Sequence, residues 1–156
     1  MTSRRLDALE LKLPPLALLA LLACVMPLGR WIDGAPWTLP RNAGGADLAV
    51  SGLALMVAGA WTFRRARTTV NPLRPETASR MVRHGPFRVT RNPMYLGMAV
   101  MLAGWAFALG SAWAAMGVPV FVAWMNRFQI APEERALRAR FGADFEAYAA
   151  EVRRWL

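Results

Sequence analysis

The chain is poor in the residues that form disulfides and metal sites. It has 156 residues but only one cysteine, Cys24, and one histidine, His84. A single cysteine excludes a disulfide within the chain, and Cys24 is best interpreted as a small buried apolar residue. A single histidine without cysteines or further histidines is a poor metal ligand, so the sequence predicts no metal site.

Charged residues are absent from three long stretches, residues 13–29, 48–63 and 92–126. The third is long enough for two membrane crossings, since a helix of about 20 residues spans a bilayer core. Gly110 and Ser111 lie near its middle, and a Gly-Ser pair ends one helix and begins another, which predicts a tight helical hairpin. The first two stretches are short for full crossings and need flanking residues or bilayer thinning.

These stretches predict an all-α integral membrane protein with four transmembrane helices. The chain is 56% hydrophobic and its mean hydropathy is +0.26, both unusual for a soluble domain. We expect one domain over residues 1–156, with two transmembrane helices in residues 1–63 and the hairpin and tail in residues 64–156. In the tail, apolar residues recur every three or four positions, which predicts amphipathic cytoplasmic helices interrupted at Gly142. These positions are Leu137, Phe141, Phe145, Tyr148, Val152 and Trp155.

The positive charge is unevenly distributed. The net charge is +9, and a soluble protein with this balance would be a candidate for nucleic-acid binding. Here the basic residues cluster before the first stretch, in residues 64–91 and after the hairpin, where the positive-inside rule places them in the cytoplasm. The sequence therefore predicts a multi-pass protein of the cell membrane with both termini cytoplasmic and no nucleic-acid partner.

Two polar motifs flank the predicted hairpin. Residues 91–95 read Arg-Asn-Pro-Met-Tyr, and Glu133 and Glu134 follow the last predicted crossing. Because both ends of a hairpin lie on one side of the membrane, the asparagine, the tyrosine and the two carboxylates are predicted to form a polar pocket. Two alternatives stay open at this point. The glutamates also suit the positively polarised start of a helix, and His84 is either a structural side chain or a catalytic base.

The same motifs carry a family resemblance. Arg-Asn-Pro-Met-Tyr-Leu-Gly at 91–97, Glu-Glu-x-x-Leu-x-x-x-Phe-Gly at 133–142 and Tyr148 resemble, in order and spacing, the isoprenylcysteine carboxyl methyltransferase and phospholipid methyltransferase superfamily. The resemblance runs from about Pro72 to Leu156 and includes the Met-Val and Gly-Pro-Phe elements before the first motif. It implies an integral membrane enzyme that takes a methyl group from S-adenosylmethionine bound on the cytoplasmic side.

The resemblance also implies a set of cofactor-binding residues. Carried over by position, they are Met81, Val82, Phe87, Asn92, Pro93, Tyr95, Glu133 and Glu134, the last in a supporting role. Asn92 stands where isoprenylcysteine enzymes have histidine, and the phospholipid-methylating branch also has asparagine at this position. The amide of Asn92 cannot serve as an acid or base near neutral pH. Gln129 stands where some carboxyl-methylating members have arginine, so the pattern gives no support for a prenylcysteine carboxylate as acceptor.

The candidate catalytic residues are Arg91, His84 and Gln129, the first two for activating or orienting a nucleophile. Methyl transfer from an activated donor relies on positioning and dehydration and needs no covalent protein intermediate. We expect a small or lipophilic acceptor that arrives from the bilayer, with a carboxylate, a lipid amine and a thiol all open. The alternatives are a non-enzymatic four-helix scaffold or transport-associated protein and, disfavoured by the long hairpin, a basic peripheral lipid-binding adaptor. The oligomeric state is open.

Overall fold

The computed structural model describes residues 8–36, 38–66 and 81–156, and every regular element in these ranges is helical, as predicted. The bundle contains α2 (Pro15–Asp33), α3 (Leu39–Arg65), α4 (Pro93–Leu109), α5 (Ala112–Ala115) and α6 (Gly117–Trp124). A π-helical segment, η3 (Met125–Ile130), joins α6 to α7 (Ala131–Phe141), and α8 (Ala143–Glu151) follows. A short 3-10 turn, η2 (Gly85–Arg88), precedes α4. Pro72, where the family resemblance begins, lies outside the described residues.

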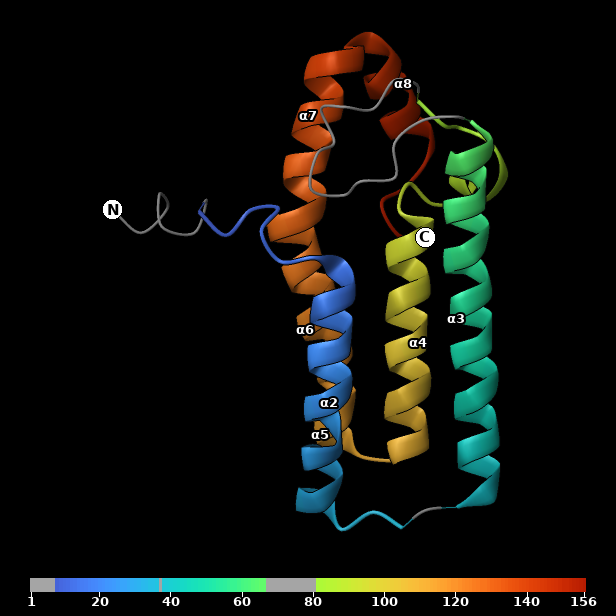
Figure 1. The fold of residues 1–156 in the computed structure, drawn as a ribbon, viewed down its shortest axis with the longest axis vertical. Helices are drawn as coiled ribbons and strands as arrows, with labels where there is room; N and C mark the ends of the chain where they lie inside the picture. The colour runs from blue at the N-terminus through green and yellow to red at the C-terminus, as the bar shows by residue number, and fades with distance from the viewer. Residues whose placement is uncertain (1–7, 37, 67–80) are drawn as a thin grey trace.

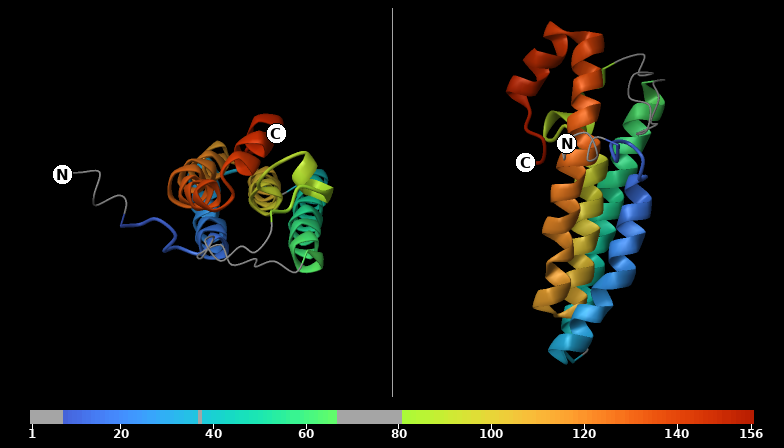
Figure 2. Two further views of the ribbon diagram at one scale, coloured as in Figure 1. Left: turned by 90° about the horizontal axis from the view of Figure 1, so that it is seen from above. Right: turned by 90° about the vertical axis from the view of Figure 1, so that its left-hand side faces the viewer.

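The helices α2, α3, α4 and α6 run side by side (Figure 1). α4 lies between α3 on one side and α2 and α6 on the other, and the view from above shows the same order (Figure 2). The connections from α2 to α3 and from α4 to α5 lie at one end of the bundle, and η2, α7 and α8 lie at the other. α7 continues α6 beyond the bundle, and the chain then folds back until its last residues reach the start of α4. The starts of α4 and α7 therefore meet at one end.

The predicted hairpin turns at the predicted residues. α4 ends at Leu109, Gly110 has a φ of 62°, in the left-handed region that glycine favours, and Ser111 is the N-cap of α5. The Ser111 hydroxyl accepts a hydrogen bond from the Ala114 N–H at 3.0 Å, which satisfies a donor of the first helical turn. The second predicted break is also confirmed, because Gly142, with a φ of 52°, separates α7 from α8.

α2 and α3 are long and apolar enough to cross a membrane. Only 17% of the apolar window of each helix is buried inside the protein, whereas the core helix of a soluble protein is mostly buried. Large apolar side chains such as Leu28 on α2 and Val57 on α3 are exposed. α3 begins at Leu39, well before the uncharged stretch that predicted it, and so gains the flanking residues that the stretch lacked. Cys24 is exposed on α2, which corrects the expectation that it is buried.

Glycines bring α3 and α4 into backbone contact. Gly45, Gly52 and Gly59 recur every seven residues along α3, and the first two face Gly104 and Gly97 on α4. A methyl group added to Gly52 would lie 2.5 Å from the Gly97 carbonyl oxygen, and one added to Gly97 would lie 2.4 Å from the Gly52 oxygen. Small residues at such spacing let helices approach closely, which stabilises their packing in a membrane. We term this contact the glycine seam.

The proline inside α2 is compensated from α4. Pro27 has no backbone N–H, so the carbonyl oxygen of Ala23, four residues earlier, loses its helical donor. The indole Nε1–H of Trp105 donates to this oxygen at 3.0 Å. A carbonyl oxygen that is kept from water and has no donor is costly, so the free oxygen of Ala23 would otherwise destabilise α2. Trp105 therefore joins α4 to α2 at the point where the α2 backbone is incomplete.

Replacing Trp105 by phenylalanine is expected to lower the free energy of unfolding by about 1–2 kcal/mol, because the oxygen of Ala23 loses its donor. Denaturant titration in detergent micelles measures this. Pro27→Ala supplies the matched background, since alanine restores an N–H that reaches Ala23 within α2. In that background the Trp105→Phe substitution should change stability little, and an equal loss in both backgrounds would contradict the pairing.

Candidate active site

The carboxyl group of Glu133 is held between α4 and the helix that carries it. The Tyr95 hydroxyl, in the first turn of α4, donates to Glu133 Oε1 at 2.5 Å, and Gln129 Nε2 donates to the same oxygen at 2.5 Å. Tyr95 and Gln129 are both buried. Both donors reach Oε1, so Oε2 has no hydrogen-bond donor among the residues that the structure describes. The carboxyl group is fixed by the protein while one of its oxygens can accept a bond from a ligand.

Burial raises the pKa of Glu133 to about 7. Removal from water disfavours the charged form of a carboxyl group. The hydrogen bonds from Tyr95 and Gln129 favour the charged form but do not offset the burial, and the charge of Glu134 raises the pKa further. Near neutral pH this group therefore lies between its two protonation states, and a bound cation would ionise it.

A π-helical segment carries the chain into α7. The helix runs from α6 through η3, so Pro132 lies in a continuous helix rather than at the start of a new one. The Phe128 oxygen, four residues before this proline, accepts a hydrogen bond from the Leu11 N–H at 3.0 Å. Glu10 forms an ion pair with Arg127 of η3. The segment before α2 therefore lies against η3, and π segments are frequent at functional sites.

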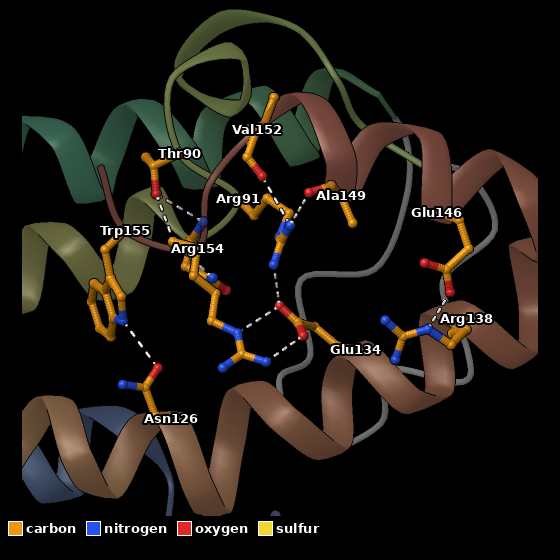
Figure 3. A network of polar contacts seen from close by, with 11 residues as sticks. Thr90, Arg91, Asn126, Glu134, Arg138, Glu146, Ala149, Val152, Arg154 and Trp155 are labelled. Atoms are coloured by element: carbon orange, nitrogen blue, oxygen red, sulfur yellow. Dashed lines mark hydrogen bonds and ion pairs between the residues drawn. The ribbon is translucent and has the colours of Figure 1, made fainter.

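Glu134, the neighbour of Glu133, binds two arginines (Figure 3). Arg91 Nη2 donates to Glu134 Oε1 at 2.8 Å, and Arg154 donates through Nε to Oε1 at 2.9 Å and through Nη2 to Oε2 at 2.7 Å. Burial alone would raise the pKa of Glu134, but the hydrogen bonds and charges of Arg154 and Arg91 outweigh it and lower the pKa. Glu134 is therefore ionised at neutral pH.

Arg91 also binds the carbonyl groups at the end of α8. Its Nη1 donates to the carbonyl oxygens of Ala149 at 2.7 Å and Val152 at 2.9 Å (Figure 3). Its backbone N–H donates to the Arg153 oxygen at 2.9 Å. The last carbonyl groups of a helix lack helical donors and carry partial negative charge, so a cation is favourable there. The guanidinium group of Arg91 is thus engaged by Glu134 on one side and by α8 on the other.

The chain after α8 is bound along the start of α4, and we term residues 152–155 the clasp. Thr90 Oγ1 and Asn92 Nδ2 each donate to the Arg154 carbonyl oxygen at 3.0 Å. Trp155 Nε1 donates to Asn126 Oδ1 of η3 at 3.0 Å (Figure 3). The clasp therefore ties together the start of α4, η3 and, through Glu134, the start of α7.

A family model described as phospholipid methyltransferase matches residues 40–144, well over half of the chain and across both site motifs. The chain belongs to the phospholipid methyltransferase family. A stretch of 63 residues is 43% identical to an uncharacterized protein of Haemophilus influenzae, a match that covers 40% of this chain and 100% of that protein. No solved structure matches the chain. Membership and the two apolar helices indicate a methyltransferase associated with a membrane.

The predicted site residues of this family member fall into two clusters and a remainder. The first cluster is Tyr95, Gln129 and Glu133, and the second is Arg91, Asn92 and Glu134. Of the remainder, Val82, Phe87 and Pro93 are buried, Met81 is half-buried and His84 is exposed. His84 precedes η2 without a side-chain cap hydrogen bond, and no polar contact between it and either cluster occurs in the described ranges.

The clasp is not predicted from the sequence. The arginines of the tail indicate only topology there, although the second of two adjacent glutamates needs a cation to neutralise it. A buried glutamate needs partners, and Arg154 lies within the segment that the family resemblance covered. The pairing of Trp155 with Asn126 has no comparable signal, because the apolar stripe predicts only that Trp155 packs against the bundle.

Proposed function

We propose that this chain is an S-adenosylmethionine-dependent membrane methyltransferase that acts on a small or lipophilic acceptor. Family membership supports methyl transfer at a membrane. The observation that carries the cofactor assignment is the Glu133 carboxyl group, which Tyr95 and Gln129 hold through a single oxygen. Such a group recognises an ammonium ion, and the amino-acid end of S-adenosylmethionine carries one.

The donor set fits both charges at that end of the cofactor. The ammonium group suits Oε2 of Glu133, because charge-assisted hydrogen bonds to a buried carboxylate are strong. The cofactor's carboxylate needs a donor, and the Nε–H of Arg91 is buried without a partner in the described part of the chain. We propose that Met81, Val82, Phe87 and Pro93 line the rest of the pocket and that Asn92 and Glu134 support it through the clasp.

When bound, S-adenosylmethionine supplies a methyl group that its positively charged sulfonium has already activated. The chain's residues then bind, orient and exclude water. Tyr95 and Gln129 hold the Glu133 carboxyl group, and we propose that Gln129 keeps it oriented toward the ammonium group. Arg91 and His84 are proposed to orient the acceptor, whose candidate reacting groups are a lipid amine, a thiol and a carboxylate.

We further propose a single domain with four membrane crossings, in which residues 64–156 form the cofactor-binding core. The crossings would be α2, α3, α4 and the continuous helix of α6 and η3, with both termini and the site in the cytoplasm. Exposed arginines at the end of the bundle that carries η2, α7 and α8 support this orientation, among them Arg65, Arg88 and Arg138. The test is a reporter enzyme that is active only outside the cytoplasm, fused to the C-terminus. Activity of this fusion would overturn the proposed orientation.

Binding of S-adenosylmethionine is expected to strengthen as the pH rises toward about 7, the pKa of Glu133. Below this pH the carboxyl group is protonated and neutral, so an ammonium ion must displace its proton, and affinity should fall by about tenfold per pH unit. Above about pH 8 the α-amino group of the cofactor loses its own proton. Affinity should therefore be greatest in a narrow window between these two values.

Calorimetric titration of detergent-purified protein at several pH values measures this window. Titrations in buffers of different ionisation enthalpy should also show that binding below the window releases protons. Absence of binding to folded wild-type protein would refute the proposed function. An affinity that does not depend on pH in this range would instead remove Glu133 from the ammonium site.

A further inference from the structure

The clasp reaches the candidate site from a part of the chain that the site motifs do not include. The clasp contains Arg154, whose guanidinium group binds the carboxyl group of Glu134. Among the described residues, Glu134 is the acidic residue that this guanidinium group contacts. Glu134 is next to Glu133 in the first turn of α7. The contact therefore acts on the residue beside the proposed ligand of the cofactor.

We infer that Arg154 is a positioning residue for the S-adenosylmethionine site: through Glu134 it fixes the start of α7 against the start of α4 and so keeps Glu133 beside Tyr95. This inference rests on the proposed function, because it assigns Arg154 a role in holding the same cofactor.

The geometry of the pair is specific to arginine. Nε and Nη2 of Arg154 donate to the two different oxygens of Glu134, at 2.9 Å and 2.7 Å. A guanidinium group presents its donors in a rigid plane that matches a carboxylate, whereas a lysine ammonium is a single point charge. The two bonds fix the orientation of the Glu134 carboxyl group as well as its distance.

That orientation is passed to Glu133 by the helix. Successive helical side chains point about 100° apart, so a fixed Glu134 sets the direction in which Glu133 leaves α7. Glu134 is tied to α4 through Arg91 at 2.8 Å, and the backbone of Arg154 is tied to the same region by Thr90 and Asn92. These contacts hold the start of α7 against the start of α4. The hydrogen bond of 2.5 Å between Tyr95 and Glu133 connects the same two helix starts.

The positive charge of Arg154 supports the cofactor site in the same direction as its hydrogen bonds do. The groups that act on the pKa of Glu133 are Glu134 on α7, Tyr95 on α4 and the neutral donor Gln129 on η3. Arg91 and Arg154 bind Glu134, and Arg127 and Arg135 each pair with Glu10. Loss of Arg154 leaves Glu134 with Arg91 alone, and the charge of Glu134, now less well compensated, then raises the pKa of Glu133. The Arg154 side chain is 40% exposed, so solvent screens part of this effect and the expected change is moderate.

The test compares Arg154→Gln with Arg153→Gln in the cofactor-free protein. Both remove one positive charge from neighbouring residues, but the Arg153 side chain is exposed and forms no ion pair in the described part of the chain. Infrared titration of the carboxyl C=O stretch, assigned by its absence in Glu133→Gln, reads the ionisation of Glu133. Arg154→Gln should move the midpoint upward by about one pH unit and weaken binding of S-adenosylmethionine about fivefold at neutral pH. Arg153→Gln should change neither.

Arg154→Lys keeps the charge without the planar pair of donors, so it should give an intermediate shift and serves if Arg154→Gln does not fold. If wild-type protein binds S-adenosylmethionine but the Arg154 variants titrate and bind as wild type does, the inference is overturned and the function stands. If wild-type protein binds no cofactor, the proposed function fails, and the infrared titration alone still decides whether Arg154 acts on Glu133.

Discussion

Replacing Glu133 by glutamine is expected to weaken S-adenosylmethionine binding by about 100-fold at pH 7.5. Glutamine keeps the shape of the side chain and can still accept the hydrogen bond from Tyr95, but it carries no charge to meet an ammonium ion. A hydrogen bond to a charged group contributes about 1.5–3 kcal/mol, and the loss should approach the upper end because the bond forms away from water. Calorimetry on the purified variant measures the change.

The same substitution should abolish the rise of affinity toward neutral pH, since no other group with a pKa near 7 would remain in the cluster. Glu146→Gln is the matched control. Glu146 lies on α8, is exposed and pairs with Arg138, so its loss removes a carboxylate of the C-terminal helices away from the site. It should change affinity by less than about twofold. Equal effects of the two substitutions would show that Glu133 does not bind the cofactor.

Replacing Gly97 by alanine is expected to destabilise the bundle by about 3 kcal/mol or more. The added methyl group would lie 2.4 Å from the Gly52 oxygen and 2.9 Å from the Met56 nitrogen, both backbone atoms that cannot rotate away. Alanine favours a helix over glycine by about 1 kcal/mol, which is too little to compensate. The helices must separate, and α3 has its main packing surface on α4. Denaturant titration in micelles measures the loss.

Gly44→Ala is the matched control for the glycine seam. A methyl group there would lie 2.9 Å from a ring atom of Phe107, whose side chain is half exposed and can turn away. The helical preference of alanine then dominates, and stability should be unchanged or slightly higher. If Gly44→Ala and Gly97→Ala destabilise the protein equally, close backbone contact is not what holds α3 against α4.

The fold was predictable where local chemistry decides it. A stretch without charge predicts a helix across a membrane, and a Gly-Ser pair at its middle predicts the turn that the structure has at Gly110 and Ser111. The contact between Tyr95 and Glu133 follows from the hairpin, because a helix that returns must place its two ends on the same side. These predictions needed only neighbouring residues and the connectivity of the chain.

The partners of arginine were not predictable in this way. Arg91 belongs to a motif that suggests a role in catalysis, yet its guanidinium group binds Glu134 and the end of α8. An arginine can satisfy its donors with any carboxylate or carbonyl oxygen, so its partners depend on how distant segments pack. The π segment was not predictable for a related reason. Pro132 and the two glutamates after it are typical of the start of a new helix, whereas they lie in a helix that continues from α6.

The π segment also sets how the site responds to a change in chain length between the bundle and α7. A π-helical turn holds about one residue more than an α-helical turn, so deleting one residue from 125–130 would allow a regular α-helix that leaves α7 in nearly its present direction. Deleting one residue from the regular helix α6 would instead turn every later residue by about 100° about the helix axis, and Glu133 would leave the face that meets Tyr95. A change in length within the π segment should therefore disturb the site less than the same change in α6.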